Sequence, residues 1–145
     1  MPVRDKSAPD LLVDTSVAVA LLVADHEHHE ALHTELGGRR LGLSGHAAFE
    51  TFSVLTRLPP PARRTPQVVA RVISENFPHS VFLSAKGAER LFGKLVDAQI
   101  AGGSVYDALV GAAAAEHGLV LATRDRRAAE TYRALGLEVE MLGQS

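Results

Sequence analysis

The sequence contains no cysteine, which excludes disulfide bonds and thiolate metal sites and suits a reducing cytoplasm. We therefore expect a cytoplasmic protein. No apolar run approaches the roughly 20 residues that a membrane-spanning helix needs, and the polar N-terminus lacks the apolar core of a signal peptide. The net charge is −2, so any contact with nucleic acid must come from local basic clusters.

The 145 residues, of which 46% are apolar, are enough for one domain with a real hydrophobic core. We expect residues 1–10 to be a flexible N-terminal segment and residues 11–145 to form the domain. Short apolar runs alternate with segments of helical periodicity, which predicts an α/β fold: a parallel β-sheet with helices on both faces. Strands are expected at residues 11–13, 41–44, 80–84, 119–123 and 139–142. Helices are expected at residues 17–24, 25–36, 47–58, from 65–66 onward, 88–100, 104–117 and 128–135.

Three histidines share one face of the helix expected over residues 25–36. His26, His29 and His33 are spaced by three and four residues, and such a set could ligate a transition metal. No carboxylate with a clear supporting role accompanies them. We therefore favour a solvated polar face over a metal site.

Two aspartates follow buried strands. Asp14 comes directly after residues 11–13, and Asp125 comes shortly after residues 119–123. Both are expected at the edge of the sheet where open α/β folds place their sites. Aspartate is also a preferred helix N-cap, so either residue alone is ambiguous. The recurrence of the arrangement favours a functional site.

Two further acids lie on predicted helices. Glu50 has small and apolar neighbours at helical spacing, and a carboxylate in such a setting should have a partner. A salt bridge to Arg57 and a functional role are equally compatible with this position. Asp107 fits a capping box that begins at Ser104, and here too capping and function remain equally open.

With right-handed crossovers, the elements that carry these four acids can converge at one edge of the sheet. Carboxylates gathered in this way repel one another unless protons or cations neutralise them. Ligation by carboxylates alone selects Mg²⁺ or Mn²⁺. The chemistry indicated is phosphodiester hydrolysis by a metal-activated water.

Four motifs carry a family resemblance: LLVDTSV, FETFSVLTRLP, SVYDALVGAAA and LATRDRRA. In this order and spacing, from residue 11 to about residue 142, the chain resembles PIN-domain ribonucleases, and most closely the VapC-type toxins of bacterial toxin–antitoxin pairs. The resemblance implies that four acids bind Mg²⁺ or Mn²⁺: Asp14, Glu50, Asp107 and Asp125. It also implies that the hydroxyls of Ser16 and Thr123 support these acids.

The same resemblance implies an RNA substrate, a homodimer and a cognate VapB-type antitoxin whose tail crosses the active-site groove. The lack of a long apolar run predicts no membrane partner. The candidates for contacts with RNA phosphates flank the acids in sequence: Arg63, Arg64, Arg124, Arg126 and Arg127. For any single arginine, however, a solvated surface position is the simpler expectation.

Three alternatives remain. One is a PIN-domain nuclease that processes RNA without an antitoxin, and another is a non-catalytic PIN-like interaction module. A receiver-like phosphoacceptor domain also pairs a strand-end aspartate with Mg²⁺. It ranks low because its paired early acids and late lysine are not evident in this sequence.

Overall fold

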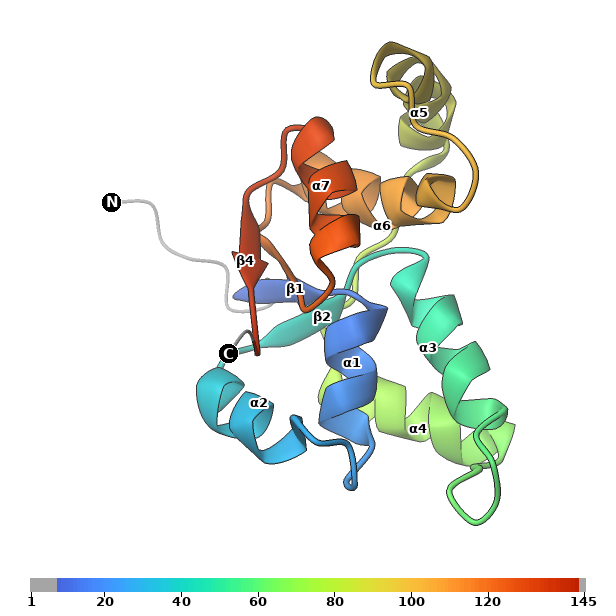
Figure 1. The fold of residues 1–145 in the computed structure, drawn as a ribbon, viewed down its shortest axis with the longest axis vertical. Coiled ribbons are helices and arrows are strands. Elements are labelled where there is room, and N and C mark those ends of the chain that lie inside the picture. The colour runs from blue at the N-terminus through green and yellow to red at the C-terminus, as the bar shows by residue number, and fades with distance from the viewer. Residues whose placement is uncertain (1–7, 144–145) are drawn as a thin grey trace.

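Four short parallel strands lie side by side in the order β2-β1-β3-β4 in the computed structural model, which describes residues 8–143 (Figure 1). They are β1 (Leu11–Val13), β2 (Leu41–Leu43), β3 (Leu121–Thr123) and β4 (Val139–Met141). The central strands β1 and β3 are buried along their whole length. Strands covered on both faces need uninterrupted apolar runs. The sequence alone therefore predicted both of these strands.

Seven helices are described, and they cover the sheet on both sides (Figure 1). In this view α1 to α4 gather on one side of the strands, while α6 and α7 lie on the other and α5 packs against α6. The expected parallel α/β architecture is confirmed. The helices are α1 (Thr15–Leu22), α2 (His29–Leu36), α3 (Ala47–Thr56), α4 (Pro66–Asn76), α5 (Ala85–Asp97), α6 (Ser104–His117) and α7 (Arg126–Ala134).

The prediction of a strand at residues 80–84 was wrong. A single parallel bridge joins Ser44 to Val81, and no strand forms around it. The Ser80 hydroxyl accepts a hydrogen bond from the Leu43 N–H at 2.9 Å. A further β-strand would have to pair with β2 through that N–H, so the side chain of Ser80 ends the pairing.

The interpretation of the histidines as a solvated face was right only in part, because His33 is exposed but two of the three histidines also contact α1. His29 Nδ1 lies 3.1 Å from the carbonyl oxygen of Ala20, and His33 Nε2 lies 3.0 Å from that of Leu21. These oxygens belong to the last turn of α1, where helical carbonyls lack partners within the helix. Within residues 8–143 the histidines form no metal-binding group. His29 and His33 attach α2 to the end of α1 instead.

The expected N-terminal segment lies largely outside the described residues, as do residues 144–145. At its described end, the main-chain N–H of Asp10 donates to the Arg40 carbonyl at 2.7 Å, and the Asp10 carboxylate accepts from the Arg40 N–H at 2.8 Å. No helix among residues 8–143 combines the length and the hydropathy that crossing a membrane requires.

The close approach at Gly42 gives a test of this packing. A Cβ atom at Gly42 would collide with the main-chain carbonyl of His79. We therefore expect Gly42→Ala to lower the free energy of unfolding by about 1–3 kcal/mol. Gly93→Ala is the matched control, because no heavy atom lies within 4 Å of its added Cβ and alanine favours a helix interior by about 0.5–1 kcal/mol. Urea denaturation measures both, and equal stability of Gly42→Ala and wild type would contradict the packing.

Candidate active site

Asp14 is the buried centre of the site, with only 4% of its surface exposed. It follows β1 and is the N-cap of α1, where Oδ1 accepts from the Val17 N–H at 3.3 Å. Oδ1 also accepts from the Ser16 hydroxyl at 2.6 Å, and Oδ2 accepts from the Tyr132 hydroxyl at 2.8 Å. Burial raises the pKa of the Asp14 carboxyl, although these hydrogen bonds oppose the rise.

Glu50 lies in the first turn of α3 and reaches the start of α1. Its Oε2 accepts from the Thr15 hydroxyl at 2.9 Å, and its Oε1 lies 3.5 Å from His46 Nε2. Among the described residues no ion pair joins Glu50 to Arg57, so the salt bridge considered from the sequence does not form. The hydroxyl of Thr15 therefore holds the Glu50 carboxylate close to the end of β1, which Asp14 directly follows.

Asp107 lies in the first turn of α6, but the capping box expected there is absent. The N-cap is Gly103 rather than Ser104, and its backbone is already helical (φ −60°, ψ −26°), whereas a capping serine needs an extended backbone. The pKa of Asp107 is raised to about 6, first by burial and then by repulsion from the carboxylates of Asp125, Glu50 and Asp14. The four acids lie directly after β1 and in the first turns or at the N-caps of α3, α6 and α7, and we call them the acidic cluster.

Asp125 completes the acidic cluster from the start of α7. Its Oδ1 caps that helix by accepting from the N–H groups of Arg127 at 2.9 Å and Ala128 at 3.3 Å. Its own N–H donates to the Thr123 hydroxyl at 3.0 Å. Asp14 and Asp125 are therefore both helix N-caps, and both belong to the acidic cluster.

The hydroxyls of Ser16 and Thr123 connect the two strand ends. Their oxygens lie 3.3 Å apart, and Ser16 Oγ also accepts from the Arg124 N–H at 2.9 Å. Because Ser16 donates to Asp14 while Thr123 accepts from Asp125, the pair fixes the distance between the β1–α1 turn and the β3–α7 turn. Ser16 thus binds the carboxylate of Asp14, and Thr123 binds the main chain of Asp125.

Sequence reasoning missed three partners of the acids: Thr15, His46 and Tyr132. Tyr132 is 1% exposed, and burial together with the nearby Asp14 carboxylate raises the pKa of its hydroxyl. In the sequence it belongs to the apolar stripe of a helix, and nothing local connects it to a residue 118 positions earlier. His46 stood four residues before Glu50, a spacing that could have suggested the pair.

The five arginine candidates lie in two separate places, and only one of these places is next to the acidic cluster. Arg63 Nε donates to the Leu58 carbonyl at 2.8 Å, and Arg64 Nη2 donates to the Leu22 carbonyl at 2.9 Å. Leu22 ends α1, roughly 12 Å along the helix from Asp14 at its start. Arg63 and Arg64 thus lie at the far end of α1 and α3 from the acidic cluster.

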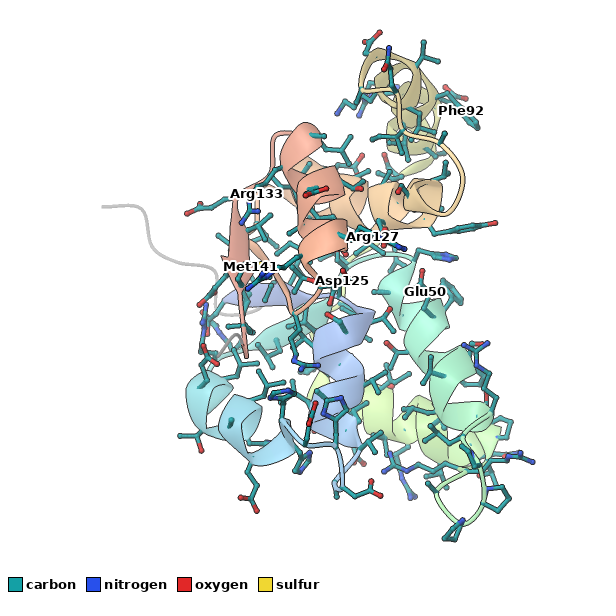
Figure 2. All side chains as sticks on the ribbon, viewed as in Figure 1. Glu50, Phe92, Asp125, Arg127, Arg133 and Met141 are labelled. Atoms are coloured by element: carbon teal, nitrogen blue, oxygen red, sulfur yellow. The ribbon has the colours of Figure 1, made fainter. Side chains whose placement is uncertain are left out.

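The other basic run, Arg124, Arg126 and Arg127, adjoins the acidic cluster. Figure 2 shows Arg127 and Asp125 at the start of α7, facing the end of α3 that carries Glu50. The positive charge of Arg127 lowers the pKa of Asp107, against the larger effects that raise it. Among residues 8–143, no three His, Asp or Glu side chains are already assembled around a position for a metal ion.

The sequence model of the PIN domain matches residues 11–134. The chain belongs to the PIN domain family. It is 49% identical to Ribonuclease VapC27 of Mycobacterium tuberculosis over 131 residues, which are 90% of this chain and 96% of that protein. It is 46% identical to Ribonuclease VapC40 of the same species over 133 residues, or 89% of this chain and 96% of that protein. These matches confirm the resemblance read from the four motifs.

A solved structure shares the fold of this PIN domain. The DNA-bound VapBC complex of Salmonella typhimurium contains a chain that matches with a TM-score of 0.66 at 18% identity. The match covers 92% of this chain and 98% of that one. At such low identity the likeness concerns the fold alone, and it supports a parallel sheet covered by helices.

The raised pKa of Asp107 makes stability depend on pH. Because the folded-state pKa of about 6 exceeds the ordinary value of 3.8, the folded state binds this proton more tightly. The contribution of Asp107 to stability without divalent cations should therefore fall as pH rises from about 4 to about 6 and change little above that range. Asp107→Asn should raise the melting temperature at pH 7.5 by a few degrees, and this difference should shrink toward pH 4.

Asp25→Asn is the matched control for this measurement, because Asp25 is exposed in the turn after α1. It should follow the wild-type pH profile. A melting temperature for Asp107→Asn that equals the wild type at every pH would contradict the repulsion within the acidic cluster.

Proposed function

We propose that this PIN domain is a divalent-metal-dependent endoribonuclease, and that it acts as the toxin of a VapBC-type toxin–antitoxin pair. The observation that carries the proposal is that hydrogen bonds bring the turns bearing the four acids together. The Thr15 hydroxyl donates to Glu50, and the Ser16 and Thr123 hydroxyls lie 3.3 Å apart. The 49% identity with Ribonuclease VapC27 over 90% of the chain supports RNA as the substrate.

The acidic cluster suits Mg²⁺ or Mn²⁺ because all of its candidate ligands are carboxylate oxygens. With a pKa of about 6, Asp107 is mostly ionised at neutral pH. Protonation of Asp107 therefore removes little of the repulsion among the four carboxylates. A bound cation would neutralise the cluster and would supply a hydroxide nucleophile by lowering the pKa of its water. The residues that would hold it are Asp14, Glu50, Asp107 and Asp125.

Neighbouring side chains orient these ligands. Ser16 and Tyr132 bind opposite oxygens of Asp14 and so fix the plane of its carboxylate. Thr15 engages Oε2 of Glu50. Hydrogen bonds of this kind to ligating carboxylates set their geometry and are worth about 10–100-fold in metal affinity or activity.

The basic run at the start of α7 is suited to hold the RNA backbone. Arg124, Arg126 and Arg127 adjoin the acidic cluster, where the cleaved phosphodiester would lie, and we propose that they contact its phosphates. Arg63 and Arg64 lie at the far end of α1. They remain candidates only for RNA long enough to extend there.

Purified protein should cleave single-stranded or looped RNA with Mg²⁺ or Mn²⁺ and lose this activity in EDTA. Asp14→Asn should stay folded and lose at least about 100-fold in rate, because it removes a charged ligand. Asp25→Asn, outside the acidic cluster, should cleave like wild type. Gel assays on labelled RNA measure this, and equal cleavage by Asp14→Asn prepared in parallel would expose a contaminating nuclease and overturn the assignment.

We further propose a VapB-type antitoxin and a second copy of this chain as protein partners. The fold matches a chain of the VapBC complex of Salmonella typhimurium. On α5, Phe92 and Val96 are 71% and 76% exposed. Such apolar exposure is typical of surfaces that a partner protein covers.

Expression of the chain alone should arrest bacterial growth, and coexpression with an adjacent antitoxin gene should restore growth and yield a copurifying complex. Asp14→Asn should be harmless at equal expression because it lacks the nuclease activity. Growth at verified expression in several hosts, with RNA cleavage intact in vitro, would favour an RNA-processing nuclease without an antitoxin. Binding of Mn²⁺ without any cleavage would favour the interaction module.

A further inference from the structure

Exposed aromatic rings gather beside the acidic cluster. Phe49, Phe82 and Tyr106 are 65%, 51% and 56% exposed. The chain has only five phenylalanines, two tyrosines and no tryptophan, so this one region takes a large share of its aromatic side chains. Exposed aromatics that lie together mark a binding surface more often than single ones do.

The rings form two pairs contributed by three segments. The centroids of Phe49 and Phe82 lie 6.1 Å apart, and those of His46 and Tyr106 lie 5.5 Å apart in a stacked arrangement with an interplanar angle of 26°. The Gly45 N–H donates to the Val81 carbonyl at 2.7 Å, which holds the segment of Phe82 beside the start of α3. We call these four rings the aromatic surface.

The aromatic surface directly borders the acidic cluster. Phe49 precedes Glu50, Tyr106 precedes Asp107, and His46 Nε2 lies 3.5 Å from Glu50 Oε1. From this border an open groove of about 360 Å³ continues along α3. It is lined by His46, Phe49, Glu50, Ser53, Val54 and Arg57.

We propose that the aromatic surface stacks on unpaired RNA bases adjacent to the cleaved phosphodiester. This inference rests on the proposed ribonuclease function and adds how the substrate is held. A strand whose phosphodiester lies at the acidic cluster must place its neighbouring nucleotides on the surface that borders the cluster. Every base has a π-face that stacks on aromatic side chains, and such contacts change affinity by about five- to 150-fold per base.

The same geometry favours RNA over a protein segment as the occupant. Beside its apolar residues, the groove contains the hydroxyl of Ser53, the positive charge of Arg57 and the Glu50 carboxylate of the acidic cluster. A strand that runs along α3 would bring a phosphate toward Arg57 while its bases lie on the rings. Bases in a duplex hide their faces in the helical stack, so this surface would select single strands and loops.

The test combines Phe49→Ala with RNA oligonucleotides that carry one abasic nucleotide at successive positions. Binding is measured by fluorescence anisotropy in EDTA, so that no RNA is cleaved. With wild type, an abasic nucleotide at one or two adjacent positions should weaken binding by about fivefold or more. Phe49→Ala should weaken binding of the intact RNA by a similar factor and should show no further loss at those positions.

Two variants control the result. Phe49→Trp should restore the affinity and the sensitivity to the abasic nucleotide, because tryptophan keeps a stacking face. Gln67→Ala truncates an exposed side chain on α4, outside both the aromatic surface and the acidic cluster, and should bind RNA like wild type. The oligomeric state of each variant is checked by gel filtration, so that a change of assembly is recognised.

The stacking proposal would be overturned if Phe49→Ala bound the intact RNA as tightly as wild type. It would also be overturned if the abasic nucleotide weakened binding equally in wild type and Phe49→Ala. Loss of antitoxin binding with RNA binding unchanged would also overturn it and would assign the surface to a protein. Cleavage by wild type with Mn²⁺ is measured in parallel. If wild type cleaves RNA, these failures concern the stacking surface alone, whereas absent binding and cleavage would overturn the proposed function as well.

Discussion

The burial of Asp14 at the end of β1 is the constraint on which the rest of the site depends. A carboxylate that is 4% exposed is costly unless it is hydrogen-bonded. The donors come from Ser16, from the Val17 N–H and from Tyr132 of α7. Tyr132 can reach Asp14 only when α7 packs on the sheet. The hydrogen bond that offsets the burial of Asp14 therefore also places Asp125, at the start of α7, at the same edge of the sheet.

The acidic cluster opposes folding. Burial, and then repulsion within the cluster, raises the pKa of Asp107 to about 6, so ionisation of this residue costs folding free energy at neutral pH. The buried strands β1 and β3 and the helices on both sides of the sheet offset that cost. A ligand of opposite charge would relieve it, and binding would then stabilise the folded state by mass action.

The starts of α3 and α6 are built alike. In each, an aromatic residue directly precedes an acid: Phe49 before Glu50 and Tyr106 before Asp107. Successive residues on a helix point about 100° apart, so one helical turn can direct its acid toward the cluster and its ring toward solvent. The proposed catalytic groups and the proposed base-stacking surface thus share two helix ends, and a strand held by one necessarily meets the other.

The sequence by itself determined the order of the elements, the parallel sheet and the two strand-end aspartates, because apolar runs and helical periodicity are properties of contiguous residues. Tertiary structure decided which side chains meet. It paired Glu50 with Thr15, 35 positions away, and Asp14 with Tyr132, 118 positions away, and it turned two histidines toward α1. It also ended the pairing at residues 80–84 through a serine hydroxyl. Such partners depend on how helices pack across the sheet, and no local pattern records that packing.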